Sequence, residues 1–208
     1  MTVWRNISYR STNCNNLPGA ADRWFHKGPN MVIRSVIISS TGLDLRDYRE
    51  AAEEICKRLH LFPVAMEYFE AMGLGATEGS KRKIDEADVY VGIYAHRYGY
   101  IEQGHDKSVT EIEFDYAGER NIERLCFVVD PKWPWPPDAW DYKNQEPLQS
   151  FKARLSASLI RSQFTTVDDL RVKLMHALVE WKGRVHGEFV NYAAIGIWNR
   201  PRQWCRHA

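Results

Sequence analysis

Short apolar segments alternate along this chain with longer segments whose apolar residues recur at a helical spacing. The short segments span residues 32–38, 61–66, 88–94, 124–130 and 160–164. Runs of this length, rich in β-branched residues, are typical of strands buried on both faces of a sheet. The second run contains Pro63, whose missing backbone donor favours an edge position.

The helical segments fall between these runs. A stripe of apolar residues predicts a helix over 44–60, and shorter helices are expected over 80–86, from Ser108 onward, over 148–159, and after a cap at Thr166. Strictly alternating strands and helices indicate a parallel sheet covered on both faces. We expect an α/β fold with about five strands in the order 2-1-3-4-5.

The helix that begins at Ser108 carries the main candidate for chemistry. Ser108 and Glu111 have the spacing of a capping box, which gives Glu111 a structural role. At about 100° per residue, Glu113 falls on the same face as Val109, toward the sheet, and Glu111 points away. A carboxylate on that face, beside a strand's carboxyl end, stands where open α/β sheets bind ligands. The structural alternative is an ion pair between Glu113 and Arg97 or Arg82.

Hydroxyls and a basic turn surround this position. Ser39, Ser40 and Thr41 follow the first strand and can contact a phosphate at the next helix N-terminus, or simply cap that helix. After the third strand, Arg97 can bind a pyrophosphate or Glu113, and Tyr98 can stack on a ring. His96 is a possible general base, although a lone histidine in a turn is more often structural.

Six segments in one order carry a family resemblance: 39–41, 44–50, 63–69, 87–93, 96–99 and 108–113. Over roughly residues 35–181 the chain resembles the TIR-like domain of unknown function that is often fused to STAND-type NTPases and repeat proteins. The resemblance implies a flavodoxin-like or TIR-like three-layer sandwich. More distantly, residues 113–117 are similar to the Glu-x-x-x-Ala segment of nucleoside deoxyribosyltransferases, and TIR-type NAD-cleaving enzymes use a helix glutamate for related chemistry.

The resemblance implies an N-glycosidase that cleaves NAD or a related nucleotide, with a product that signals in bacterial defence. Glu113 would act at the anomeric carbon, and Ser39, Ser40, Thr41, Arg97, Tyr98 and Ser108 are the substrate-binding candidates. No metal or cofactor is required. Two alternatives stay open: a non-enzymatic self-assembly module, and a nucleoside deoxyribosyltransferase-like hydrolase.

Composition narrows the class of protein. The chain has 208 residues, of which 44% are hydrophobic and 26% charged, as in ordinary globular proteins. No apolar run approaches the ~20 residues of a membrane helix, and the N-terminus lacks a signal peptide's apolar region, so we expect a cytoplasmic protein. Four scattered cysteines suggest neither a zinc site nor a disulfide framework.

The charge pattern suggests three regions. Residues 1–30 form a basic arm, 31–182 an acidic α/β domain, and 183–208 a basic tail with interleaved tryptophans. Such a tail can bind single-stranded nucleic acid, but an oligomer contact or a docking strap is at least as reasonable. We expect a nucleotide substrate, a homo-oligomer and a STAND or effector partner, and neither a membrane nor a nucleic acid. Residues 72–79 read as a mobile Gly-rich loop without Walker chemistry, and 101–107 as a lid.

Overall fold

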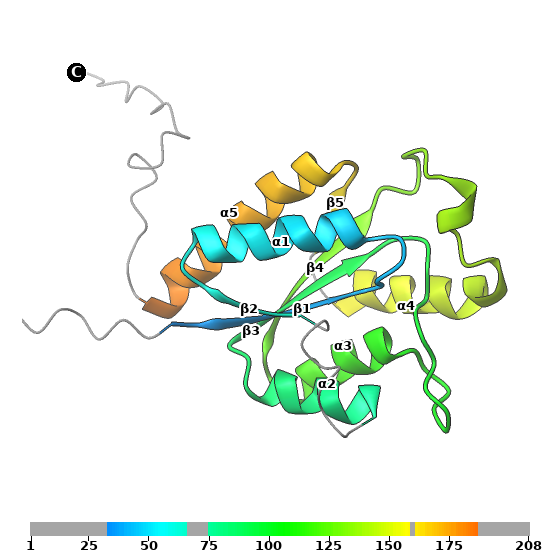
Figure 1. Cartoon of the computed structure of the whole chain (residues 1–208), viewed down its shortest axis with the longest axis horizontal. Coiled ribbons are helices and arrows are strands. Elements are labelled where there is room, and N and C mark those ends of the chain that lie inside the picture. The colour runs from blue at the N-terminus through cyan, green and yellow to red at the C-terminus, as the bar shows by residue number, and fades with distance from the viewer. Residues whose placement is uncertain (1–32, 66–74, 159–160, 187–208) are drawn as a thin grey trace, which may run out of the picture. The chain divides into compact units, whose positions relative to one another are not determined.

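The computed structural model describes residues 33–65, 75–158 and 161–186. Its centre is one sheet of five parallel strands in the order β2-β1-β3-β4-β5 (Figure 1). The strands are β1 (Ser35–Ser40), β2 (Phe62–Ala65), β3 (Val89–Tyr94), β4 (Glu123–Val129) and β5 (Ser162–Phe164). The predicted fold class and strand order are confirmed, and β2 with its Pro63 lies at an edge as expected.

Helices cover both faces of the sheet and complete three layers (Figure 1). They are α1 (Arg46–Arg58), α2 (Ala76–Asp85), α3 (Val109–Glu119), α4 (Gln145–Ser158) and α5 (Val167–His186), with 3-10 turns η2 (Pro137–Ala139) and η3 (Tyr142–Asn144). Helix α1 packs beside α5 on one face, while α2, α3 and α4 lie on the other.

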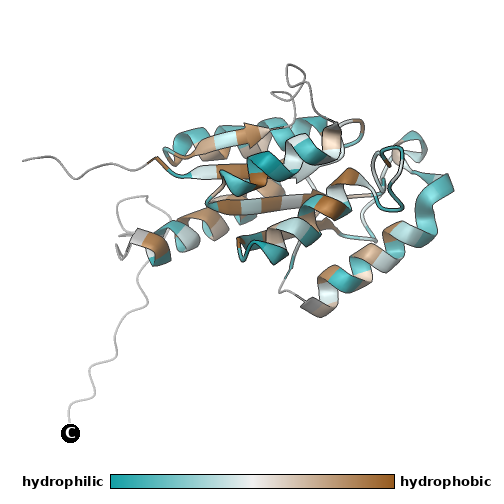
Figure 2. Cartoon of the chain, turned by 90° about the horizontal axis from the view of Figure 1, so that it is seen from below, coloured by the Kyte–Doolittle hydropathy of each residue, from teal (hydrophilic) through white to brown (hydrophobic). Residues whose placement is uncertain are grey.

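Alternation along the strands divides the core in two. On β1, Val36 and Ile38 face α1 and α5, where Leu174 and Trp181 complete one cluster. Ile37 faces the opposite way, toward the cluster that contains Tyr90 of β3 and the helices α3 and α4. The hydropathy colouring shows the hydrophobic strands lying between helices whose outer faces are hydrophilic (Figure 2). Apolar burial on both faces fixes each strand's register and therefore the positions of the residues at its carboxyl end.

Several predicted boundaries move. Ser39 and Ser40 lie within β1 instead of in a following turn. Helix α2 begins at Ala76, four residues before the expected start, because the Glu102 carboxylate accepts the backbone N–H groups of Ala76 and Thr77, each at 2.9 Å. Much of the predicted Gly-rich loop is therefore helical.

The ends of the chain fall largely outside the described residues. The predicted arm over 1–30 and most of the predicted tail lie outside them. Residues 72–74 of the internal Gly-rich loop also lie outside the described residues. Helix α5 does cross the expected boundary at residue 182, since it continues to His186.

Candidate functional site

A cavity of about 390 Å³ lies at the carboxyl ends of β1 and β3. Parallel strands bring their carboxyl ends to one edge of the sheet, so the segments that follow β1 and β3 meet there. Three predicted substrate-binding residues line the cavity: Ser40, Thr41 and Arg97. Thr110 at the start of α3 and Asp141 before η3 contribute further polar groups to its wall.

Gly99 allows the turn after β3 to pass close to α3. Its φ of +98° lies in the left-handed region, and a Cβ at this position would lie 3.2 Å from Thr110 Oγ1 and 3.3 Å from Thr41 Cγ2. Glycine thus sets both the conformation of the turn and the width of the cavity beside it.

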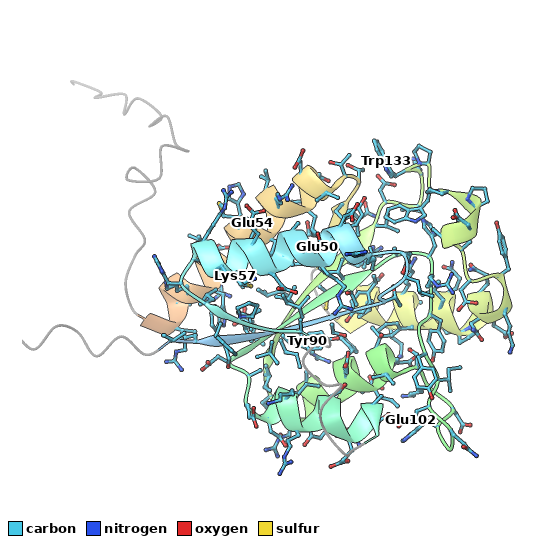
Figure 3. All side chains as sticks on the ribbon, in the orientation of Figure 1. Glu50, Glu54, Lys57, Tyr90, Glu102 and Trp133 are labelled. Atoms are coloured by element: carbon cyan, nitrogen blue, oxygen red, sulfur yellow. The ribbon has the colours of Figure 1, made fainter. Side chains whose placement is uncertain are left out.

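A second cavity of about 380 Å³ adjoins the first, since Leu43 and Arg97 line both. Aromatic side chains make up much of its wall. Trp135 stacks on Tyr48 with ring centroids 5.5 Å apart, and Trp133 stands on the loop after β4 (Figure 3). The loop after β4, with Trp133, Pro134 and Trp135, therefore packs onto the domain and supplies an apolar wall to the cavity that Arg97 also lines.

Glu113 lies on the inward face of α3, as predicted, and only 2% of it is exposed. Ser39 Oγ donates a hydrogen bond to Glu113 Oε2. Burial raises the pKa of Glu113, while the hydroxyls of Ser39 and Ser80 and the charge of Arg49 lower it by less. Glu113 thus meets a hydroxyl where the structural alternative had placed Arg97 or Arg82.

The carboxylate and the first cavity lie on different sides of β1. Successive side chains of a strand point to opposite faces, so Ser39 turns toward Glu113 while Ser40 lines the cavity. Glu113 lines neither of these two cavities, nor a third cavity beside the end of β4. In this conformation the end of β1 separates the carboxylate from the space in which a substrate would lie.

Two expected substrate contacts are internal to the domain. Tyr98 is 3% exposed, and its hydroxyl donates to Glu111 Oε2 at 2.5 Å, so no ring face is presented to a ligand. Ser108 is fully buried and caps α3 by accepting the N–H of Glu111 at 3.2 Å. The cap is confirmed, but the Glu111 carboxylate turns to Tyr98 and to Arg154, 2.5 Å away, instead of returning to the backbone of Ser108.

Asp44 is a polar residue of the site that was not among the predicted substrate-binding or catalytic residues. Thr41 Oγ1 donates to its carboxylate, and the residue lines the second cavity. Burial raises the pKa of Asp44, and the nearby charge of Arg97 lowers it by less. Its position two residues before a helix that follows a strand was the available signal.

The family model named Domain of unknown function (DUF4062) matches residues 35–179. The chain belongs to this family. No curated protein matches the DUF4062 chain. Among solved structures it is similar to the TIR domains in the structure of the activated Roq1 resistosome directly recognizing the pathogen effector XopQ. The identity is 14%, the match covers 69% of this chain and 82% of that chain, and the TM-score is 0.39.

Over 33–65, 75–158 and 161–186, no three His, Cys, Asp or Glu side chains cluster in a way that could hold a metal ion. Within the same ranges no helix has the length and apolar character needed to cross a bilayer. Cys56 and Cys126 are buried as free thiols, and burial raises the pKa of each to about 12.

Proposed function

We propose that this DUF4062 domain binds a nucleotide at the carboxyl edge of its sheet and cleaves an N-glycosidic bond in NAD or a related nucleotide. The observation that carries the proposal is the place of Arg97. This residue lines both adjoining cavities, and its guanidinium has no ion-pair partner within 4.0 Å among the described residues. A permanently charged fork between two cavities suits a pyrophosphate that joins two nucleosides.

The walls on either side of Arg97 suit the remaining parts of such a ligand. In the first cavity the Ser40 hydroxyl can donate to a ribose or phosphate oxygen, and the Thr41 hydroxyl, which donates to Asp44, can accept from a ribose hydroxyl. The Tyr48, Trp133 and Trp135 rings of the second cavity can pack against a base. Each cavity lies within the ~300–1,000 Å³ that small-molecule sites usually occupy.

Glu113 is the proposed catalytic carboxylate. When the bond between the base and the anomeric carbon breaks, the sugar is left with a positive charge. An ionised carboxylate can stabilise this charge directly, or it can bond to the anomeric carbon and form a covalent adduct that water then hydrolyses. This role requires Glu113 to release Ser39 and reach the first cavity. Thr110, one turn earlier on α3, already lines that cavity.

A non-enzymatic interaction module is the second candidate function. It is favoured by the burial of Glu113 and by the Ser39 hydrogen bond, which hold α3 against β1 without presenting the carboxylate to a ligand. Under this proposal the domain acts by binding copies of itself or a STAND-type partner. A cytoplasmic location and a role in defence belong to both candidates.

The test is a product assay on the full chain at high protein concentration with a crowding agent. NAD and a panel of nucleosides are the substrates, and released base is measured by chromatography. We expect nicotinamide release that falls at least a thousandfold in Glu113→Gln, since the carboxylate's charge is lost, and about tenfold or more in Arg97→Gln. Glu119→Gln, an exposed site on the same helix, should leave the rate unchanged.

The outcomes separate the candidates. Base exchange between nucleosides with no NAD cleavage would instead support a deoxyribosyltransferase-like activity. A wild-type chain that releases no base from any substrate, while sedimenting as an oligomer, would overturn the enzymatic proposal in favour of the interaction module.

A further inference from the structure

A third cavity, of about 310 Å³, lies beside the carboxyl end of β4 and the start of β5, and it shares no lining residue with the first two cavities. Its wall carries two cations, Lys152 of α4 and Arg161 just before β5, and it contains no Asp or Glu. Neither cation has a carboxylate within 4.0 Å in the described part of the chain. Two positive charges that line one cavity without a carboxylate in contact favour an anion.

His96 supplies the second, independent sign of a ligand. It is 4% exposed and lines this cavity, and its Nε2 atom has no hydrogen-bond partner among the described residues. A buried nitrogen without a partner costs free energy, which a bound acceptor would recover. The Trp140 ring stacks on the imidazole with centroids 3.8 Å apart and so fixes its orientation.

From this cluster we infer that the third cavity is a binding site for the phosphate group of a small phosphorylated molecule. Lys152 and Arg161 supply the charge, and His96 Nε2–H donates a directed hydrogen bond. Gln149 and Gln163, which also line the cavity, can donate through their amides. The cavity is larger than a phosphate group alone requires, which leaves room for the organic part of the molecule.

The electrostatics of the third cavity agree with this assignment. Burial and the charge of Arg161 lower the pKa of Lys152 to about 8, against a smaller raising effect of Asp44. Burial, with a smaller effect of Lys152, lowers the pKa of His96 to about 4, so the imidazole is neutral at pH 7. A bound phosphate would offset the repulsion between Lys152 and Arg161. Binding should therefore weaken as the pH rises through 8 and Lys152 loses its proton.

The experiment titrates the full chain with inorganic phosphate and pyrophosphate by calorimetry, in an Arg97→Gln background that removes the phosphate contact proposed for the nucleotide site. We expect binding of one anion, a Kd that rises at least tenfold in Lys152→Met and in Arg161→Gln, and an unchanged Kd in Lys132→Met. Lys132 is exposed beside the same strand end but lines none of the three cavities, which makes it the matched control.

The results are decisive in both directions. No binding at pH 7, or a Kd that Lys152→Met and Lys132→Met change equally, would overturn the site. Thermal unfolding of each variant shows that it is folded, and Arg161→Gln covers the case in which Lys152→Met is not. Loss of NAD cleavage in Arg97→Gln with phosphate binding intact would separate this site from the nucleotide site.

Discussion

At the scale of single residues, the burial of Glu113 has a consequence for stability. Its pKa is raised in the folded protein, so the folded state binds a proton more tightly than the unfolded state. Stability from this group is therefore fully present below the unfolded pKa, and it is lost as the pH rises through the raised folded pKa. Glu113→Gln abolishes this loss because the amide does not ionise.

We therefore expect the difference in unfolding free energy between Glu113→Gln and wild type to move in favour of the variant from pH 4 to pH 8. The change should be about 1.4 kcal/mol for each unit by which burial raises the pKa. Urea unfolding across this range measures it. A difference that is flat with pH would show that Glu113 titrates alike in both states.

Removal of the Glu111 side chain should destabilise the packing of α3. Its buried carboxylate accepts from Tyr98 and from Arg154, each at 2.5 Å. Glu111→Ala leaves the buried Tyr98 hydroxyl without this acceptor and should cost about 2–3 kcal/mol in unfolding free energy. The same change at Glu119, an exposed residue of α3, should stay within about 0.5 kcal/mol. Equal effects of the two substitutions would contradict a structural role for Glu111.

At the scale of elements, the turn between β3 and α3 can be tested with two glycines. Gly99 and Gly104 both have positive φ, +98° and +90°, but only at Gly99 would a Cβ meet other atoms within 4 Å. Gly104→Ala should cost about 1–2 kcal/mol for the backbone alone. Gly99→Ala should cost more, because Thr41 and Thr110 must also shift and the first cavity narrows. Chemical denaturation of the two variants compares them directly.

If the two glycine variants were equally stable, the close approach of the turn to α3 would not constrain the cavity. A ligand-binding defect in Gly99→Ala alone would place the constraint at the site itself.

The elements themselves were the part of the structure most open to prediction. Unbroken apolar runs and alternation with helices gave the correct number and type of strands, since both faces of a parallel sheet must be buried. The order 2-1-3-4-5 was expected because it is a common order in doubly wound α/β folds. Helix α2 was predicted too short because its cap is Glu102, 26 residues after Ala76, and a long-range cap leaves no local pattern. Strand β1 was placed too early because hydroxyl residues can sit in strands as readily as in turns.

The candidate site was only partly open to prediction. Helical spacing correctly predicted that Glu113 faces the sheet. It does not predict whether a carboxylate on that face borders a cavity or accepts a hydrogen bond from a hydroxyl. Tyr98 was expected to stack on a ligand, whereas its buried hydroxyl serves Glu111. The basic cavity around Lys152 was missed because its residues come from segments far apart in the sequence, from His96 to Gln163, that only the folded sheet brings together.

At the scale of the whole molecule, segments from both faces of the sheet converge on one edge, and Asp44 links the sites there. Asp44 precedes α1 on one face and lines the second cavity. Its charge still acts on Lys152 of α4, which packs on the other face.

Asp44→Asn removes an anion that competes for Lys152, so phosphate binding at pH 6.5, where Lys152 is protonated, should tighten about two- to fivefold. Asp47→Asn, an exposed neighbour on α1, should leave it unchanged. Calorimetry in the Arg97→Gln background measures both. Equal affinities in the two variants would mean that the edge holds independent sites, whereas tightening in Asp44→Asn alone would show that the charge state of one cavity sets the anion affinity of the other.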